Sequence, residues 1–437
     1  MSSFQQNRRI ADRHLESLLR GLVILAIISA FVEGPMVEFG YIGLFLFDLI
    51  ILFLACTLLL YLPAIDELSL PSDRLFLHLT TIYLLLVVTL PFLGIIVYGH
   101  PLEYVVGDIR WLQVYLVGVI ALTVYSKHRL CFKSDVVYVF KWVVGIYFSI
   151  FLFQLSLFLE LYDTSPLLEF WFLNQSTYGE LGYHIGRFSG AGSSPSLIGL
   201  VALIGILLFF HTYFENRENI TFGLLSLVLL IASGQRTAFV ATVILITVLF
   251  TFHTNALDVA LNPKAAVPSI GGISAGFLIA YRLNIGRLQS DSRFDELLVV
   301  ILNPHKLPQV SGRGPRWEAA ISDMSVYYPI GTLANPAHVL DTKTIDSYYV
   351  IAFTQGHFLL LLVFLSFIIV AWRTIVKYRY QGRQYAIFAI IFFGPVTILS
   401  SMQNFLTSIT GKMTLVLAIT FMTMMCHKSI GNKEINH

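Results

Sequence analysis

Charged side chains are scarce in this chain. Of its 437 residues only 12% are Asp, Glu, Lys or Arg, whereas 56% belong to the hydrophobic set. The mean hydropathy is +0.76. A soluble protein of this length needs far more charge on its surface, so the composition excludes that class and predicts a polytopic membrane protein.

Cysteine is rarer still, and the sequence has no internal repeat. The three cysteines, Cys56, Cys131 and Cys426, are too widely spaced to indicate a disulfide framework or a metal site. No His, Glu or Asp cluster has metal-ligand spacing, so neither a metal nor another cofactor is expected. The absence of a 20–50-residue repeat argues against carriers built from internal symmetry.

Long apolar runs dominate what is present. Because about 20 apolar residues cross a bilayer core, the chain predicts an all-α membrane domain over residues 1–437 with about twelve transmembrane helices. The predicted helices lie near residues 20–38, 40–64, 75–98, 111–126, 136–160, 195–213, 219–234, 237–253, 265–281, 348–372, 384–401 and 410–426.

Basic residues set the expected orientation. With a cytoplasmic N-terminus, the inward loops hold sixteen Lys and Arg and the short outward loops only four, Arg110, Arg187, Arg236 and Lys412. This bias predicts that both termini are cytoplasmic. No small-residue cleavage signature follows the first apolar run, which we interpret as an uncleaved first span.

One outward connection is long. Residues 282–347 form a large loop between the ninth and tenth predicted helices, a length typical of functional or disordered connections. Apolar and polar residues mix at helical spacing between Pro315 and Pro329. Part of this loop is therefore predicted to fold.

Two outward stretches share a pattern of arginine, glycine and a helix start. In GRFSGAGSSPSLIG (186–199), Ser194 and Pro195 are suited to open a helix, and Arg187 lies just upstream. In SGRGPRWEAAISDM (311–324), Gly314 and Pro315 open a helix that carries Arg316 in its first turn. A helix N-terminus together with guanidinium groups suits a phosphate ligand.

Two more arginines belong to this group. Arg313 precedes the second helix, and Arg236 lies at the outer turn ASGQRTAFV. The alternative for such residues is interfacial anchoring, which we favour for Arg110 and Lys412.

Other polar residues leave alternatives open. Asp48 is either a functional intramembrane carboxylate or the partner of a polar group on another helix. His357 is interpreted as a packed histidine. Candidates for a general base are Asp346 at the start of the tenth span and, by position, Asp323, Glu318 and His338. Asp323 and Glu318 are equally suited to pair with Arg316 or Arg313.

The order of these motifs resembles a known family. RFSGAGSSPSLIG, SGQRTAFV, an R-x-x-R-W loop helix, Pro329-Ile330-Gly331 and D-S-Y-Y…Q-G (346–356) together resemble the bacterial O-antigen polymerase and O-antigen ligase superfamily over residues 180–360. The resemblance implies a GT-C-type glycosyltransferase of the inner membrane. It acts at the periplasmic face on saccharides linked to undecaprenyl pyrophosphate.

The resemblance also implies roles for residues. Arg187, Arg236, Arg316 and Arg313 would hold the pyrophosphate, and we take Asp346, Arg316 and Arg187 as the catalytic set. Ligases of the superfamily show a His-Asn pair where this chain has Asp346-Ser347, which favours a polymerase. His338 is positioned to substitute for that histidine.

The expected activity is polymerisation of lipid-linked repeat units into a surface polysaccharide, O-antigen or exopolysaccharide, without a metal and with inversion at the anomeric carbon. The expected partners are lipid-linked donor and acceptor, membrane lipid and, as a candidate, a chain-length regulator, with no nucleic acid. Rivals are a ligase that transfers glycan to lipid A core, a lipid-saccharide transporter or flippase, and a binding protein without catalysis.

Overall fold

The chain folds as a bundle of apolar helices. The computed structural model describes residues 3–32, 36–39, 42–61, 73–125, 129–159, 161–162, 188, 191, 195–213, 216–253, 313–340, 345–380, 383–401 and 403–434. The N-terminal half contains α1 (Ser3–Val32), β1 (Met36–Phe39), β2 (Ile42–Phe45), α2 (Leu46–Tyr61), α3 (Arg74–Tyr98), α4 (Glu103–Val124) and α5 (Arg129–Phe158). The rest contains α8 (Pro195–Thr212), α9 (Asn219–Ser233), α10 (Arg236–His253), α15 (Arg313–Asp323), η3 (Met324–Tyr327), α16 (Pro336–Val339), α17 (Tyr348–Tyr378), α18 (Arg383–Leu399), η4 (Phe405–Thr407) and α19 (Ile409–Glu434).

Apolar helices occupy eleven of the twelve predicted intervals, and the ninth interval, 265–281, lies outside the described residues. Among the described residues, five helices are long and apolar enough to cross a membrane, and five shorter apolar helices accompany them. These helices indicate a membrane protein. Many large apolar side chains face outward, for example Phe53 on α2, Ile96 on α3 and Ile369 on α17, as expected where lipid replaces water.

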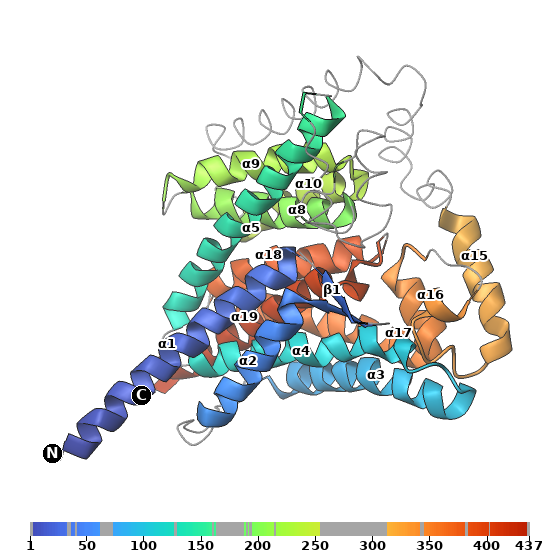
Figure 1. Ribbon diagram of the computed structural model, residues 1–437, viewed down its shortest axis with the longest axis horizontal. Helices are drawn as coiled ribbons and strands as arrows, with labels where there is room; N and C mark the ends of the chain where they lie inside the picture. The colour runs from blue at the N-terminus through green and yellow to red at the C-terminus, as the bar shows by residue number, and fades with distance from the viewer. Residues whose placement is uncertain are drawn as a thin grey trace.

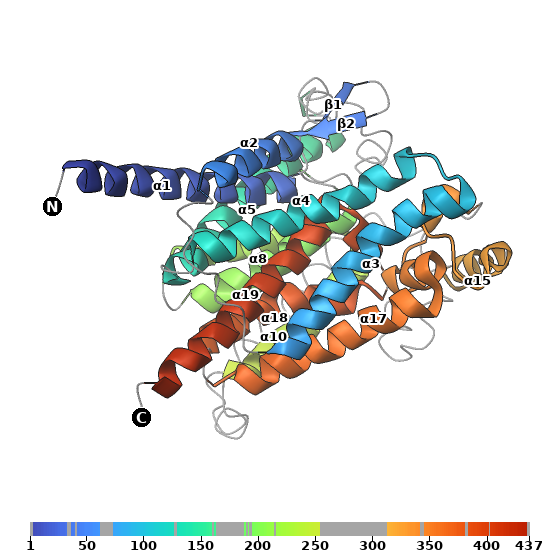
Figure 2. The same cartoon turned by 90° about the horizontal axis from the view of Figure 1, so that it is seen from below.

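The bundle is built around its C-terminal helices. The apolar stretch of α19 is entirely buried, and α18, α4 and α1 pack against it. Figures 1 and 2 show both ends of the chain at one end of the bundle and α15 at the other. We call the end that carries the termini the inner end and the end that carries α15 the outer end.

A short hairpin replaces part of the first two predicted helices. The predictions of helix at 20–38 and 40–64 are wrong for residues 36–38 and 42–45. Residues 36–39 and 42–45 pair as antiparallel strands with Met36 opposite Phe45. Proline lacks a backbone N–H and disfavours helix in the residue before it, so Gly34-Pro35 is a sequence signal for this break. The fourth helix also begins earlier than predicted, at Glu103 instead of residue 111.

The tenth predicted helix is interrupted, a feature that the apolar pattern did not predict. Within α17, Gly356 and His357 leave helical geometry, and His357 has φ 50° and ψ −148°. A straight helix would separate residues 348 and 364 by about 24 Å. Yet the ring centroids of Tyr348 and Phe364 lie 5.0 Å apart. The segment before the break therefore folds back beside the segment that follows it.

A loop occupies the break. The backbone N–H of Thr332 donates to the carbonyl of Thr354 over 2.9 Å, and that of Leu333 donates to the carbonyl of Gln355 over 2.8 Å. The carbonyl of Thr332 is in turn 2.9 Å from Nε2 of His100, beside the outer end of α3. Non-helical backbone at membrane depth is tolerated where protein satisfies its polar groups, and here the loop 331–334 does so.

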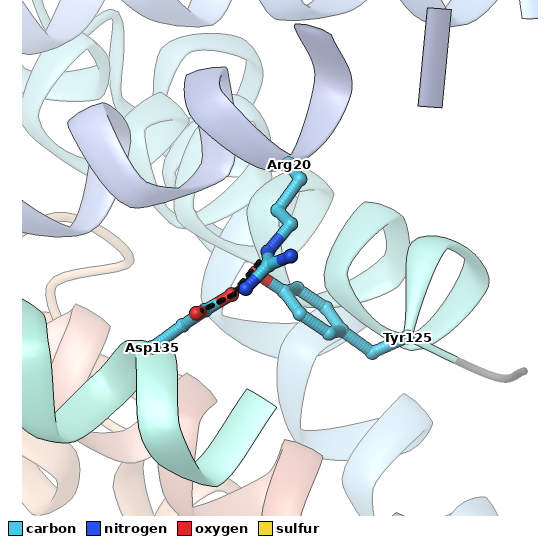
Figure 3. A network of polar contacts seen from close by, with 3 residues as sticks. All are labelled: Arg20, Tyr125 and Asp135. Atoms are coloured by element: carbon cyan, nitrogen blue, oxygen red, sulfur yellow. Dashed lines mark hydrogen bonds and ion pairs between the residues drawn. The ribbon is translucent and has the colours of Figure 1, made fainter. Parts of the chain in front are cut away.

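An ion pair fixes the inner end. Arg20 of α1 donates from Nε and Nη2 to the two carboxylate oxygens of Asp135 on α5, at 2.6 and 2.5 Å. The hydroxyl of Tyr125, just after α4, donates to the same carboxylate. Figure 3 shows the three side chains converging from three helices. Because Asp135 is 9% exposed, this contact ties α1, α4 and α5 together.

We expect Asp135→Ala to lower the free energy of unfolding by about 2–3 kcal/mol, since hydrogen bonds to charged groups contribute about 1.5–3 kcal/mol. Tyr125→Phe, which removes one of the three bonds, should cost about 1 kcal/mol. Thermal unfolding of the detergent-solubilised protein measures both. An Asp135→Ala protein that melts with the wild type would contradict this role.

We expect Gly331→Ala to disrupt the loop in the α17 break. Gly331 has φ 92°, and a Cβ there would lie 2.8 Å from the carbonyl oxygens of both Thr354 and Gln355. The matched control is Gly145→Ala, because a Cβ at Gly145 meets no atom within 4 Å. Thermal unfolding should show a clear loss for Gly331→Ala and none for Gly145→Ala. Equal melting of the two variants would refute the loop's role.

Candidate functional site

Two of the predicted catalytic residues lie together at the outer end. Nη1 of Arg316, on α15, is 3.6 Å from Oδ2 of Asp346, which lies two residues before the start of α17. Their side chains are 53% and 35% exposed. A guanidinium and a carboxylate that are 30 positions apart in the sequence therefore form an accessible ion pair, which we use as the centre of the candidate site.

Asp346 is held by its neighbours. Ile345 and Ser347 are buried on either side of it. The N–H of Tyr348 donates to the carbonyl of Ser400 over 2.9 Å, and the Tyr348 hydroxyl is 2.8 Å from that of Tyr83 on α3. The backbone on both sides of the carboxylate is thus fixed while the carboxylate itself remains accessible.

Arg316 is positioned by the packing of its helix. The helix predicted over the R-x-x-R-W stretch is present as α15, and its residue Ala320 is fully buried. Downstream of Met324, which is also buried, the chain reaches the loop 331–334 that docks into the α17 break. The same break therefore positions both members of the ion pair.

The two remaining arginine segments meet at one place. The N–H of Phe188, the residue after Arg187, donates to the carbonyl of Ala232 near the end of α9 over 3.2 Å. The Phe188 ring packs against Phe151 of α5, with centroids 5.1 Å apart. Arg187 itself lies outside the described residues, but its neighbour lies beside the turn that leads to Arg236.

Two helix N-termini converge at this turn. The predicted start of a helix at Pro195 is present in α8, and α10 begins at Arg236. A Cβ on Gly199, one turn into α8, would lie 3.2 Å from the Cβ atoms of Gln235 and Ala238. The first turns of α8 and α10 are therefore in contact. Their positive dipole ends favour an anion at this point.

Gln403 joins the α10 turn to the segment of Asp346. Its Nε2 donates to Oγ1 of Thr237 over 2.5 Å and to Oε1 of Gln235 over 3.2 Å. Gln403 lies three residues after Ser400, whose carbonyl accepts from Tyr348. Hydrogen bonds, an ion pair and short stretches of chain thus connect Phe188 to Arg316, across segments that are far apart in the sequence.

The other predicted residues are placed as follows. Glu318 is exposed on α15, and Asp323, half-buried, ends that helix. Asp323, like Asp346, interacts with another residue. The backbone of Arg313 opens α15, that of Arg236 opens α10, and His338 belongs to α16. The side chains of these three lie outside the part of the chain that the structure describes.

Of the two expected anchors, Lys412 is buried and Arg110 is half-buried. Lys412 is 1% exposed in the first turn of α19, with Nζ 5.5 Å from the centroid of the Trp111 ring. It interacts electrostatically with Asp108 of α4. Nη2 of Arg110 lies 3.7 Å from Oδ2 of Asp48, so the pairing alternative for Asp48 is correct. The anchoring interpretation of Lys412 is wrong, because a partner carboxylate lets it remain inside.

Asp108 was not predicted as a site residue, because the fourth helix was predicted to begin at residue 111. The sequence signal for this residue is the group Asp108, Arg110 and Trp111, which lies within four residues of an apolar run. An ionisable group inside a span marks function by default. Among the residues described, no group of three His, Cys, Asp or Glu side chains is placed to hold a metal ion.

Comparison with known proteins adds no assignment. No protein-family model matches the chain, and no curated protein matches it.

We expect Arg316→Gln and Asp346→Asn to fold normally. Exposed ion pairs contribute about 0–1 kcal/mol, and the backbone contacts of Ser347 and Tyr348 do not involve either side chain. Thermal unfolding should place both variants within about 1 kcal/mol of the wild type. A large loss of stability in either would show that the pair is structural.

Proposed function

We propose that this chain is a metal-independent membrane glycosyltransferase. It polymerises undecaprenyl-pyrophosphate-linked oligosaccharide repeat units into a surface polysaccharide at the periplasmic face of a bacterial inner membrane. The observation that carries the proposal is the connected outer site. There the Arg316–Asp346 pair is linked through Ser400 and Gln403 to the paired N-termini of α8 and α10.

The arrangement suits a pyrophosphate leaving group. Helix N-termini and guanidinium groups favour negative charge, and fixed donors of this kind stabilise charge that develops in a transition state. In the proposal Arg187, Arg236, Arg313 and Arg316 contact the pyrophosphate.

Asp346 supplies the base. Its carboxylate removes the proton of the acceptor hydroxyl as that oxygen attacks the anomeric carbon of the donor. The bond between the anomeric carbon and the pyrophosphate oxygen breaks, and the electron pair leaves with the lipid pyrophosphate. One displacement inverts the anomeric configuration. Arg316 has five N–H donors, enough to contact the carboxylate and the pyrophosphate together.

The depth of Asp346 along the fold-back of α17 favours a lipid-linked substrate. Tyr348 lies beside Phe364, so Asp346 is about 12 Å inward of the break, measured as eight residues of helix. A pyrophosphate carried by a polyprenyl tail reaches such a depth from the lipid side. In the proposed orientation the inner end, with Arg20 and Lys377, faces the cytoplasm, in keeping with the bias of basic residues.

Deleting the gene separates the candidate functions. Loss of a polymerase leaves surface glycan of a single repeat unit. Loss of a ligase leaves finished polymer on the lipid carrier. No change in glycan rejects both.

With purified protein and lipid-linked repeat units, we expect Arg316→Lys to lower kcat about 100- to 1,000-fold and Asp346→Asn about 100- to 10,000-fold. Lysine cannot reproduce the planar, bidentate contact of arginine. The matched control is Arg217→Lys, at the exposed turn between α8 and α9 on the inner end, which should retain full activity. Unchanged turnover in Arg316→Lys and Arg187→Lys would remove the pyrophosphate argument.

The ligase alternative is tested with the same proteins. If Asp346→Asn keeps full activity while His338→Ala is inactive, the base is His338 and the polymerase assignment loses its support.

A further inference from the structure

Two buried polar atoms on the connection between α18 and α19 lack a hydrogen-bond partner among the described residues. They are Oγ of Ser400 and Oε1 of Gln403. Ser400 is 0% exposed and Gln403 is 4% exposed. Buried polar groups are almost always hydrogen-bonded, so two unpaired atoms three positions apart require an explanation.

The other polar groups of these residues are committed to the fold. The carbonyl of Ser400 accepts from the N–H of Tyr348 and from the Ser347 hydroxyl, at 2.9 and 3.4 Å. Nε2 of Gln403 donates to Thr237 and Gln235. Both residues are thereby held in place, and the two unpaired atoms take no part in holding them.

Neighbouring hydroxyls on the same connection behave differently. Those of Ser401, Thr407 and Ser408 each donate to the backbone carbonyl three residues earlier, at 2.6–2.7 Å. A hydroxyl on this connection can therefore donate to a nearby backbone carbonyl, but the hydroxyl of Ser400 does not. The backbone geometry of the connection therefore does not explain why the atoms of Ser400 and Gln403 are unpaired.

In the proposed reaction a sugar ring lies near these two positions. Gln403 bonds to the residues that flank Arg236, and Ser400 bonds to the segment that carries Asp346. In the proposed reaction the anomeric carbon lies between the pyrophosphate and the base, so its ring spans the distance between these two segments. A serine hydroxyl donates and accepts, and an amide oxygen accepts, which matches the hydroxyls of a sugar.

Resting on the proposed function, we propose that Ser400 and Gln403 form a saccharide subsite. In this subsite Oγ of Ser400 and Oε1 of Gln403 bind hydroxyl groups of the sugar attached to the pyrophosphate. The subsite selects for the sugar and contributes nothing to recognition of the lipid pyrophosphate.

Ser400→Ala tests the subsite with little risk to the fold, because the carbonyl that accepts from Tyr348 and Ser347 remains. Two probes are compared with the full-length protein in nanodiscs: undecaprenyl pyrophosphate without sugar, and the single-repeat lipid-linked saccharide purified from cells that lack the protein. We expect Ser400→Ala to weaken binding of the saccharide probe about 5- to 10-fold, the effect of one lost hydrogen bond. Binding of the sugar-free probe should not change.

Ser401→Ala is the matched control, since its hydroxyl is satisfied internally, and it should leave both affinities unchanged. Gln403→Leu is a second variant of similar size. Because it also removes the bonds to Thr237 and Gln235, its readout is the ratio of the two dissociation constants, which a general disturbance of the fold does not move. We expect that ratio to shift about 10-fold.

The outcomes separate the subsite from the function. A selective loss for the saccharide probe supports the subsite. Equal weakening of both probes, or no change in either variant, overturns it while leaving the glycosyltransferase proposal standing. A wild-type protein that binds neither probe overturns both.

Discussion

The outer half of the molecule depends on backbone hydrogen bonds at one interrupted helix. Where Gly356 and His357 leave helical geometry in α17, the carbonyls of Thr354 and Gln355 accept from the N–H groups of Thr332 and Leu333. In an apolar environment an unpaired backbone group costs several kcal/mol. The docking of the loop that follows α15 and the fold-back of α17 therefore depend on each other, and the same docking brings Arg316 to Asp346.

This dependence explains why the candidate site combines accessibility with order. The Arg316–Asp346 pair is partly exposed, yet Ile345 and Ser347 on either side of Asp346 are buried. The next residue, Tyr348, bonds to Tyr83 of α3 and to Ser400 just after α18. The helices α9, with 15 residues, and α18, with 17, are shorter than the five long spans. The connections that follow them supply the polar side chains of Gln235 and Gln403.

Hydropathy and helix-start signals predicted much of the architecture, because both are local. The starts at Pro195 and in the R-x-x-R-W stretch follow from proline geometry and amphipathic spacing. The fold-back of α17 was not predicted, since the apolar run continues through Gly356 and His357, and a non-glycine residue with positive φ leaves no mark in the sequence. The hydrogen bonds of Gln403 to Gln235 and Thr237 join residues far apart in the sequence, so the sequence pattern did not predict them either. Arg316 and Asp346 were each chosen for their type and position, but only tertiary packing determines that they lie 3.6 Å apart.

The enclosure of α19 has a consequence for biogenesis. Its apolar stretch is the least apolar of the five long spans and has no lipid-facing side. Hydroxyl groups such as those of Thr410, Thr414 and Thr420 can be buried there because each donates a hydrogen bond to a backbone carbonyl. During translation α19 emerges after α1, α4 and α18, the helices that pack against it. It can gain its full stability only by packing between these earlier helices, so the insertion of α19 and the closure of the bundle around it are one event.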